Sequence, residues 1–144
     1  MKIRATGILI EDEKILLLNQ NVNESRSWSL PGGTLEERET LKECLVREMQ
    51  EETGLVVEVQ NLLYVCDLIT ESTHVVHITF LIKRLGGTLG NTTEGLDTQI
   101  IRGVEMVPIA DLEEYGFSNT FKQLVLDGFP RSGSYMGPKS AIGL

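Results

Sequence analysis

The chain alternates between apolar runs with a two-residue period and one amphipathic stretch with a helical period. A two-residue period is typical of β-strands with one buried face, because successive side chains point to opposite sides. Polar turns at residues 11–13 and 71–73 indicate two β-hairpins, and we expect the second to form the centre of a mixed sheet. The pattern predicts strands over residues 3–10, 14–18, 28–30, 55–70, 74–83 and 104–109.

Two helices are predicted from their capping residues. The first begins after Thr40, whose hydroxyl can accept from open backbone N–H groups while Glu43 reaches back to complete a capping box. It ends at Gly54, because glycine readily adopts the left-handed conformation that closes a helix. The second helix spans residues 119–126 behind the cap Ser118.

The order of these elements predicts a single α+β domain, the natural count for 144 residues. We assign this domain to residues 1–128. Residues 129–144 are rich in glycine and proline, so we expect an extended or partly disordered tail. The alternative is that Arg131 or Tyr135 of this tail reaches a pocket or a neighbouring subunit. A contact with a neighbouring subunit would require a homodimer.

Composition narrows the function classes. A net charge of −8 argues against stable binding to nucleic acid or to an anionic membrane. The N-terminus does not resemble a signal peptide, and no apolar run approaches the ~20 residues that span a bilayer, so a cytoplasmic location is expected. The two cysteines, Cys44 and Cys66, lie among apolar neighbours and favour reduced core thiols over a disulfide.

The first helix concentrates negative charge on one face. Glu48, Glu51 and Glu52 stand at i, i+3 and i+4, so their side chains are neighbours. They also lie toward the helix C-terminus, where the helix dipole disfavours carboxylates. A compensating cation is expected, and oxygen ligands favour Mg²⁺, with Mn²⁺ as a substitute. The alternative is a solvated acidic face with no ligand.

The segment from Gly33 to Leu55, GTLEERETLKECLVREMQEETGL, resembles the Nudix box G-x5-E-x7-R-E-U-x-E-E-x-G-U, in which U is a bulky aliphatic residue. Every specified position matches. The approach to it, from Trp28 to Gly33, and the flanking strand patterns are also similar to the Nudix family, so the resemblance extends over most of the chain.

The resemblance implies a mixed sheet between helices, an α/β/α sandwich. It also implies Mg²⁺-dependent hydrolysis of a diphosphate linkage in a nucleoside diphosphate derivative. Glu48, Glu51 and Glu52, with the backbone of Gly33, would hold the metal. The proton of the attacking water would go to Glu51 or, as second preference, to Glu48. Members often take a further carboxylate from the loop predicted at residues 86–99, where this chain offers Glu94 or Asp97.

Further residues are assigned supporting roles. Arg47 would orient the catalytic carboxylates through its planar fork, and Glu39 would act behind the ligands or through a water. Arg26, Trp28 and Gly32 are the substrate-binding candidates. For Arg26 the alternative is an exposed arginine in the predicted loop over residues 20–27, and for Trp28 it is a plain core position.

Two histidines are weaker candidates for substrate contact. His74 and His77 lie three residues apart on a predicted strand and therefore face opposite sides.

The resemblance leaves the substrate open. The proline or tyrosine tags of sub-families for ADP-ribose and diadenosine polyphosphates are missing between Cys66 and His74, and the NADH tag SQPWPFPxS is absent. This favours a nucleoside triphosphate or a modified nucleotide, with ADP-ribose or another nucleotide sugar as the alternative. A non-catalytic nucleotide-binding regulator would be expected to lose box carboxylates, and this chain keeps them all.

Overall fold

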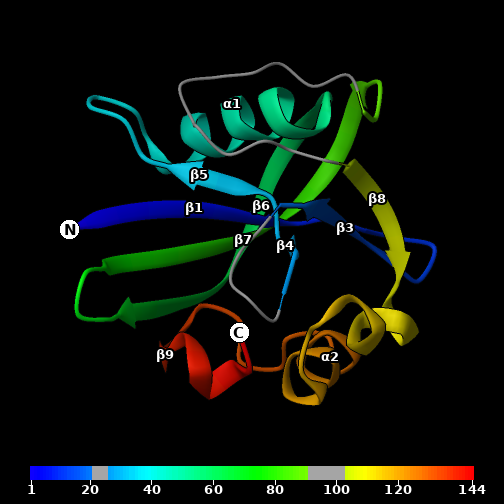
Figure 1. Cartoon of the computed structure of the whole chain (residues 1–144). Helices are drawn as coiled ribbons and strands as arrows, with labels where there is room; N and C mark the ends of the chain where they lie inside the picture. Colours follow the sequence, from blue (N-terminus) through cyan, green and yellow to red (C-terminus); the bar gives the residue numbers. More distant parts are fainter. Residues whose placement is uncertain (21–25, 91–102) are drawn as a thin grey trace.

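The structure is a computed structural model that describes residues 1–20, 26–90 and 103–144 (Figure 1). Most of the predicted loop at residues 20–27 and most of the one at residues 86–99 lie outside these ranges. The candidate ligands Glu94 and Asp97 therefore lie outside the described residues as well.

The described elements follow the predicted order, with additional short strands and 3₁₀ helices. In chain order they are β1 (Lys2–Ile8), β2 (Ile10–Glu11), β3 (Lys14–Asn19), β4 (Trp28–Ser29), β5 (Gly32–Thr34), α1 (Leu41–Thr53), β6 (Leu55–Ile69), β7 (His74–Gly87), β8 (Gly103–Pro108), η1 (Ile109–Tyr115), α2 (Asn119–Leu126), β9 (Ser134–Pro138) and η2 (Lys139–Ile142).

Two sheets form the middle of the molecule. The larger has the order β5-β1-β7-β6-β9 and is mixed, because β1 pairs with β7 and β6 pairs with β9 in parallel while its other pairs are antiparallel. In the smaller sheet, β3 pairs antiparallel with β2, β4 and β8. Helix α1 lies on one side and η1 with α2 on the other, which confirms the sandwich of helices around a mixed sheet (Figure 1).

The first predicted hairpin is only partly formed. Ile10 and Glu11 pair with Ile15 and Lys14, as the polar turn predicts. The preceding strand β1 belongs instead to the larger sheet, where β5 pairs with one edge and β7 with the other. Pairing on both edges satisfies the backbone of a strand that is buried inside the domain. The second predicted hairpin is confirmed, with β6 and β7 antiparallel over nearly their whole length.

Helix α1 has the ends that the sequence predicts. The Thr40 hydroxyl accepts from the Glu43 N–H at 3.1 Å, and the Glu43 carboxylate accepts from the Thr40 N–H at 3.2 Å. Gly54 closes the helix with φ 80°. Leu45 and Met49 are fully buried against the sheet, so the helix is fixed with the Glu48 face turned toward β5.

The C-terminal residues, expected as an extended or partly disordered tail, form β9 and η2. Phe129 and Ile142 are buried in the core cluster between the sheets and α2. The Gly133 N–H donates to the Leu63 carbonyl at 2.9 Å, at the start of the pairing between β9 and β6. A few well-spaced apolar side chains therefore anchor this segment although its composition is polar.

Three smaller expectations are also settled among the described residues. Cys44 and Cys66 are buried free thiols, as the sequence favoured. The predicted last helix is confirmed, with Ser118 accepting from the Phe121 N–H at 3.1 Å. None of the helices in the described ranges combines the length and apolarity needed to cross a membrane.

Thr40→Ala should lower the free energy of unfolding by about 1 kcal/mol, because the cap of α1 loses its acceptor. Urea denaturation measures this change. Glu43→Gln is the control, since an amide oxygen can still accept from the Thr40 N–H. An equal loss in both variants would contradict the assigned role of the Thr40 hydroxyl.

Candidate active site

Strand β5 brings a glycine backbone against the acidic face of α1. Gly32 and Gly33, expected as a turn, pair with Thr6 and Ala5 of β1. A Cβ on Gly32 would lie 2.2 Å from the Ala5 carbonyl oxygen, and one on Gly33 would lie 2.0 Å from the Glu48 carboxyl carbon. Only glycine permits both approaches. Gly32 therefore allows β5 to approach β1 closely, and Gly33 allows the Glu48 carboxylate of α1 to lie against β5.

Two carboxylates of α1 are held beside this strand. Glu48 is 4% exposed and Glu52 is 5% exposed, which is unusual for charged side chains. The Gly32 N–H donates to Glu52 Oε1 at 2.9 Å. The Gly33 carbonyl accepts a weak hydrogen bond from Cys44 Sγ at 3.6 Å. The first contact fixes the Glu52 carboxylate against β5, and the Glu48 carboxylate lies directly over Gly33.

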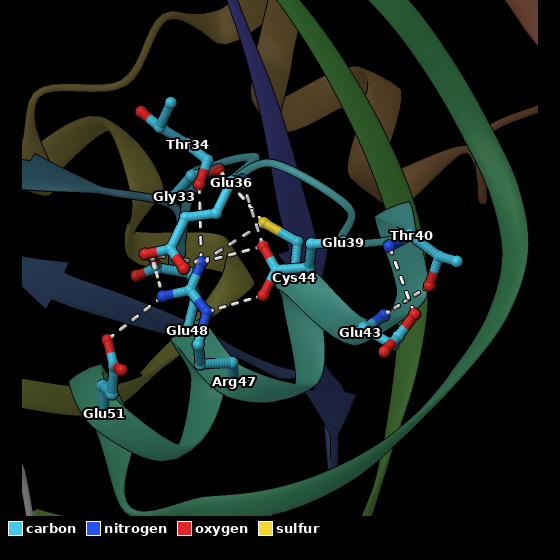
Figure 2. A network of polar contacts seen from close by, with 10 residues as sticks. All are labelled: Gly33, Thr34, Glu36, Glu39, Thr40, Glu43, Cys44, Arg47, Glu48 and Glu51. Carbon is cyan, nitrogen blue, oxygen red and sulfur yellow. Dashed lines mark hydrogen bonds and ion pairs between the residues drawn. The ribbon is translucent and has the colours of Figure 1, made fainter.

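Arg47 connects the remaining acids of the site (Figure 2). Its guanidinium donates to both carboxylate oxygens of Glu39, at 2.7 and 3.0 Å, and to Glu48 Oε1 at 2.8 Å. A longer contact of 3.4 Å reaches Glu51 Oε2. Glu43, four residues away in the other direction, is engaged in the helix cap instead. Arg47 thus donates to three carboxylates, and its Nη2 lies 3.7 Å from a fourth, that of Glu36.

The ion pairs shift the acid–base properties of this cluster. Hydrogen bonds from Arg47 hold the pKa of Glu39 below its ordinary value, and Glu39 in turn raises the pKa of Arg47. Burial raises the pKa of the Cys44 thiol to about 12. At neutral pH the cluster is therefore ionised at Glu39 and Arg47, while Cys44 stays a neutral thiol.

The donor set fits a hard divalent cation. In the described part of the chain, no three His, Cys, Asp or Glu side chains already converge as a metal centre. The buried carboxylates of Glu48 and Glu52 nevertheless lie beside the β5 backbone, and the Glu51 side chain is 30% exposed at the outer edge. Mg²⁺ commonly binds through one or two carboxylates and completes its shell with water and substrate phosphate.

A cavity of about 370 Å³ opens on the face of the larger sheet that points away from α1. Alternate residues of β1, β6 and β7 line it, together with Lys139 and Ile142 of the C-terminal segment. A second hollow of about 410 Å³ includes Glu52 in its lining and shares Arg4 and Gln20 with the cavity. Arg4 therefore lies between the acidic cluster and the cavity.

The substrate-binding candidates occupy different places. Arg26 is 8% exposed and lines the cavity, with its guanidinium 4.6 Å from the centre of the Phe117 ring. Trp28 contacts the edge of Tyr115 at 5.0 Å between ring centres and does not line either hollow described above. His77 lines the cavity and His74 the second hollow, on opposite faces of β7 as predicted.

Sequence reasoning did not single out Arg4, Tyr64 or Lys139, which also line the cavity. The two-residue period of β1 does place Arg4 and Thr6 on one face, opposite Ala5. Nothing local to Lys139 indicates its position, because that position depends on the pairing of β9 with β6.

The sequence profile of the NUDIX domain family matches residues 1–126, and the chain belongs to this family. Its members generally use divalent metal ions. The acidic helix and glycine strand described above coincide with the segment that resembles the Nudix box.

Individual relatives carry several different names. The chain is 39% identical to an ADP-ribose pyrophosphatase of Methanocaldococcus jannaschii, over 60% of this chain and 53% of the relative. It is 38% identical to the human 8-oxo-dGDP phosphatase NUDT18, over 60% of this chain and 26% of the relative. A solved ADP-ribose pyrophosphatase from Streptococcus suis is 25% identical with a TM-score of 0.67, over 95% of this chain and 97% of that one. The matches thus span about half or less of the two curated relatives.

Arg47→Met should lower the free energy of unfolding by about 2–3 kcal/mol at neutral pH, because buried Glu48 loses a charged donor. The folded-state pKa of Glu39 is lowered, so its share of this stabilisation is fully present above about pH 5 and is lost as the pH falls through that lowered pKa. The gap between wild type and variant should therefore shrink in acid.

Chemical denaturation at several pH values measures this gap. Arg84→Met is the matched control, because Arg84 forms a more exposed ion pair with Glu11 and its loss should cost less than about 1 kcal/mol. Equal losses for both variants at neutral pH would contradict the central role of Arg47.

Proposed function

We propose that this protein hydrolyses a diphosphate linkage in a nucleoside diphosphate derivative, with Mg²⁺ as cofactor and Mn²⁺ as a substitute. The observation that carries the proposal is the placement of buried Glu48 and Glu52 against the β5 glycines. Family membership and the names of two relatives, an ADP-ribose pyrophosphatase and an 8-oxo-dGDP phosphatase, support the same reaction class.

Each residue of the site has a definite task in this proposal. Glu48 and Glu52 would hold the metal, together with Glu51 and the Gly33 carbonyl. The bound ion would neutralise diphosphate charge and lower the pKa of a water molecule. Glu51 is the most exposed of the three carboxylates and would accept the proton of that water, with Glu48 as the second choice.

Arg47 and Glu39 would act on the orientation of these groups. The bidentate contact to Glu39 fixes the guanidinium plane, and this plane directs one donor to Glu48 and a longer one to Glu51. The site would then keep its carboxylates in place without reorganisation during the reaction.

We propose two groups of substrates for this protein rather than a single compound. A nucleoside triphosphate or modified nucleotide is our first choice and ADP-ribose or another nucleotide sugar the second, and the relatives carry names of both kinds. The net charge of −8 supports a small nucleotide rather than nucleic acid as the ligand. The cytoplasmic location stays a prediction, and so does the homodimer.

A product-release screen tests the reaction class directly. Nucleoside triphosphates, oxidised nucleotides, ADP-ribose, dinucleotides and nucleotide sugars would each be incubated with Mg²⁺ or Mn²⁺, and products separated by anion-exchange chromatography. We expect cleavage within the diphosphate of at least one group. If every compound stays intact with both metals, the enzymatic proposal fails and a binding module is favoured.

Glu51→Gln should lower kcat by about 10²–10⁴-fold, because a general base is lost. Glu52→Gln should in addition remove the rise of the thermal midpoint that Mg²⁺ causes, while its amide oxygen can still accept from the Gly32 N–H. Calorimetry with and without Mg²⁺ gives the midpoints. Glu43→Gln on the same helix is the control and should behave as wild type. Unchanged turnover by Glu51→Gln would refute the catalytic assignment.

A further inference from the structure

The cavity on the far face of the larger sheet is lined by cations from three separate segments. Arg4 comes from β1, Arg26 precedes β4, and Lys139 begins η2. None of the three forms an ion pair with the described residues, and the described lining includes no Asp or Glu side chain. Three positively charged side chains thus line a cavity of about 370 Å³ to which the described residues contribute no Asp or Glu side chain.

The three cations are close enough to affect one another. The pKa of Lys139 is lowered to about 8, first by burial and then by the charges of Arg26 and Arg4. Arg26 is more than nine-tenths buried, and its Nη1 donates a long hydrogen bond of 3.3 Å to the Trp28 carbonyl. Desolvated like charges are costly, and a bound anion would relieve both the repulsion and the lost hydration.

Some neutral polar groups in the same wall have no hydrogen-bond partner among the described residues. Ser29 Oγ and His77 Nε2 are buried without a hydrogen bond to any described residue. Burial, followed by the charges of Lys139 and Arg4, lowers the pKa of His77 to about 3, so the imidazole is neutral. A hydroxyl and a neutral imidazole can both donate to an oxygen of a ligand. The cavity wall therefore contains buried hydrogen-bond donors for which the described residues provide no acceptor.

The cavity is also connected to the acidic cluster. Arg4 Nη2 donates to the Gly32 carbonyl at 3.2 Å, and the Gly32 N–H donates to Glu52 at 2.9 Å. Arg4 and Gln20 line both the cavity and the hollow that includes Glu52. One extended molecule can therefore contact the carboxylates at one end and the three cations at the other.

We propose that this cavity binds a second anionic group of the substrate, a phosphate or a carboxylate, remote from the diphosphate that is cleaved. The inference rests on the proposed function, because it assigns the far end of the same substrate. Lys139 then acts as a specificity residue that the C-terminal segment supplies from beyond the family match at residues 1–126. A volume of about 370 Å³ is within the range of small-molecule sites and leaves room for a neighbouring sugar.

The first test uses pairs of substrates that differ at one group. UDP-glucuronate and UDP-glucose differ by a carboxylate, and ADP-ribose with or without a phosphate on its terminal ribose differs by that phosphate. We expect the anionic member of at least one pair to have the lower KM in wild type. Lys139→Gln should raise that KM about tenfold or more with kcat nearly unchanged, because one charge-assisted hydrogen bond is lost. The pair that responds identifies the anion.

Two further variants separate charge from structure. Lys139→Arg keeps the positive charge and should restore most of the lost affinity. Lys122→Gln is the matched control, because Lys122 pairs with Glu113 on the surface outside the cavity. It should leave both KM values unchanged. Loss in Lys139→Arg equal to that in Lys139→Gln would overturn the proposal in favour of a structural role for Lys139.

A second test requires neither metal nor turnover. In EDTA at constant ionic strength, inorganic phosphate should change the fluorescence of Trp28, the only tryptophan, whose carbonyl contacts Arg26. The phosphate concentration at half-change should rise about tenfold or more in Lys139→Gln and stay constant in Lys122→Gln.

The two tests fail independently of the proposed reaction. Phosphate binding that depends on Lys139, without hydrolysis of any nucleotide, would reject the reaction and keep the anion site. Hydrolysis with equal KM values within both pairs and no phosphate response would keep the reaction and reject the anion site. That second result would favour a neutral nucleobase as the occupant of the cavity.

Discussion

The guanidinium of Arg47 forms ion pairs with four carboxylates that would otherwise repel one another at close range, those of Glu36, Glu39, Glu48 and Glu51. Because its fork is planar and permanently charged, it compensates the acids and also fixes their directions. Glu39 receives both arms of the fork, and Glu48 receives the remaining donor while it rests on Gly33. The acidic face of α1 is therefore an ordered structure before any metal ion arrives, and this order is what the proposed chemistry requires.

Close backbone approach provides the second constraint. The β5 glycines allow the larger sheet to touch α1 on one side, while Arg4 of β1 reaches the Gly32 carbonyl from the other. One short edge strand thus separates two very different environments. The Glu52 carboxylate lines the second hollow and is suited to a cation, whereas three cations line the cavity and are suited to an anion.

Local signals predicted much of the fold, and pairing between distant segments accounts for the rest. The cap at Thr40 and the stop at Gly54 depend on neighbouring residues alone, and both were predicted. Gly32 was expected in a turn, since nothing in its neighbourhood reveals that β1 would pair with it. The role proposed for Arg47 rests on the resemblance to a known box. The cavity wall at Lys139 could not be predicted, because a composition rich in glycine and proline gave no sign of β9.

Strand β9 also bears on how the protein behaves at high concentration. Without it, β6 would present a long row of open N–H and carbonyl groups at the margin of the sheet, and such margins template association between chains. Parallel pairing with Ser134–Pro138 covers part of that row. The covering strand is short and ends in a proline, which has no N–H to offer a further strand. The same segment that completes the cavity therefore protects the protein against aggregation through its sheet edge.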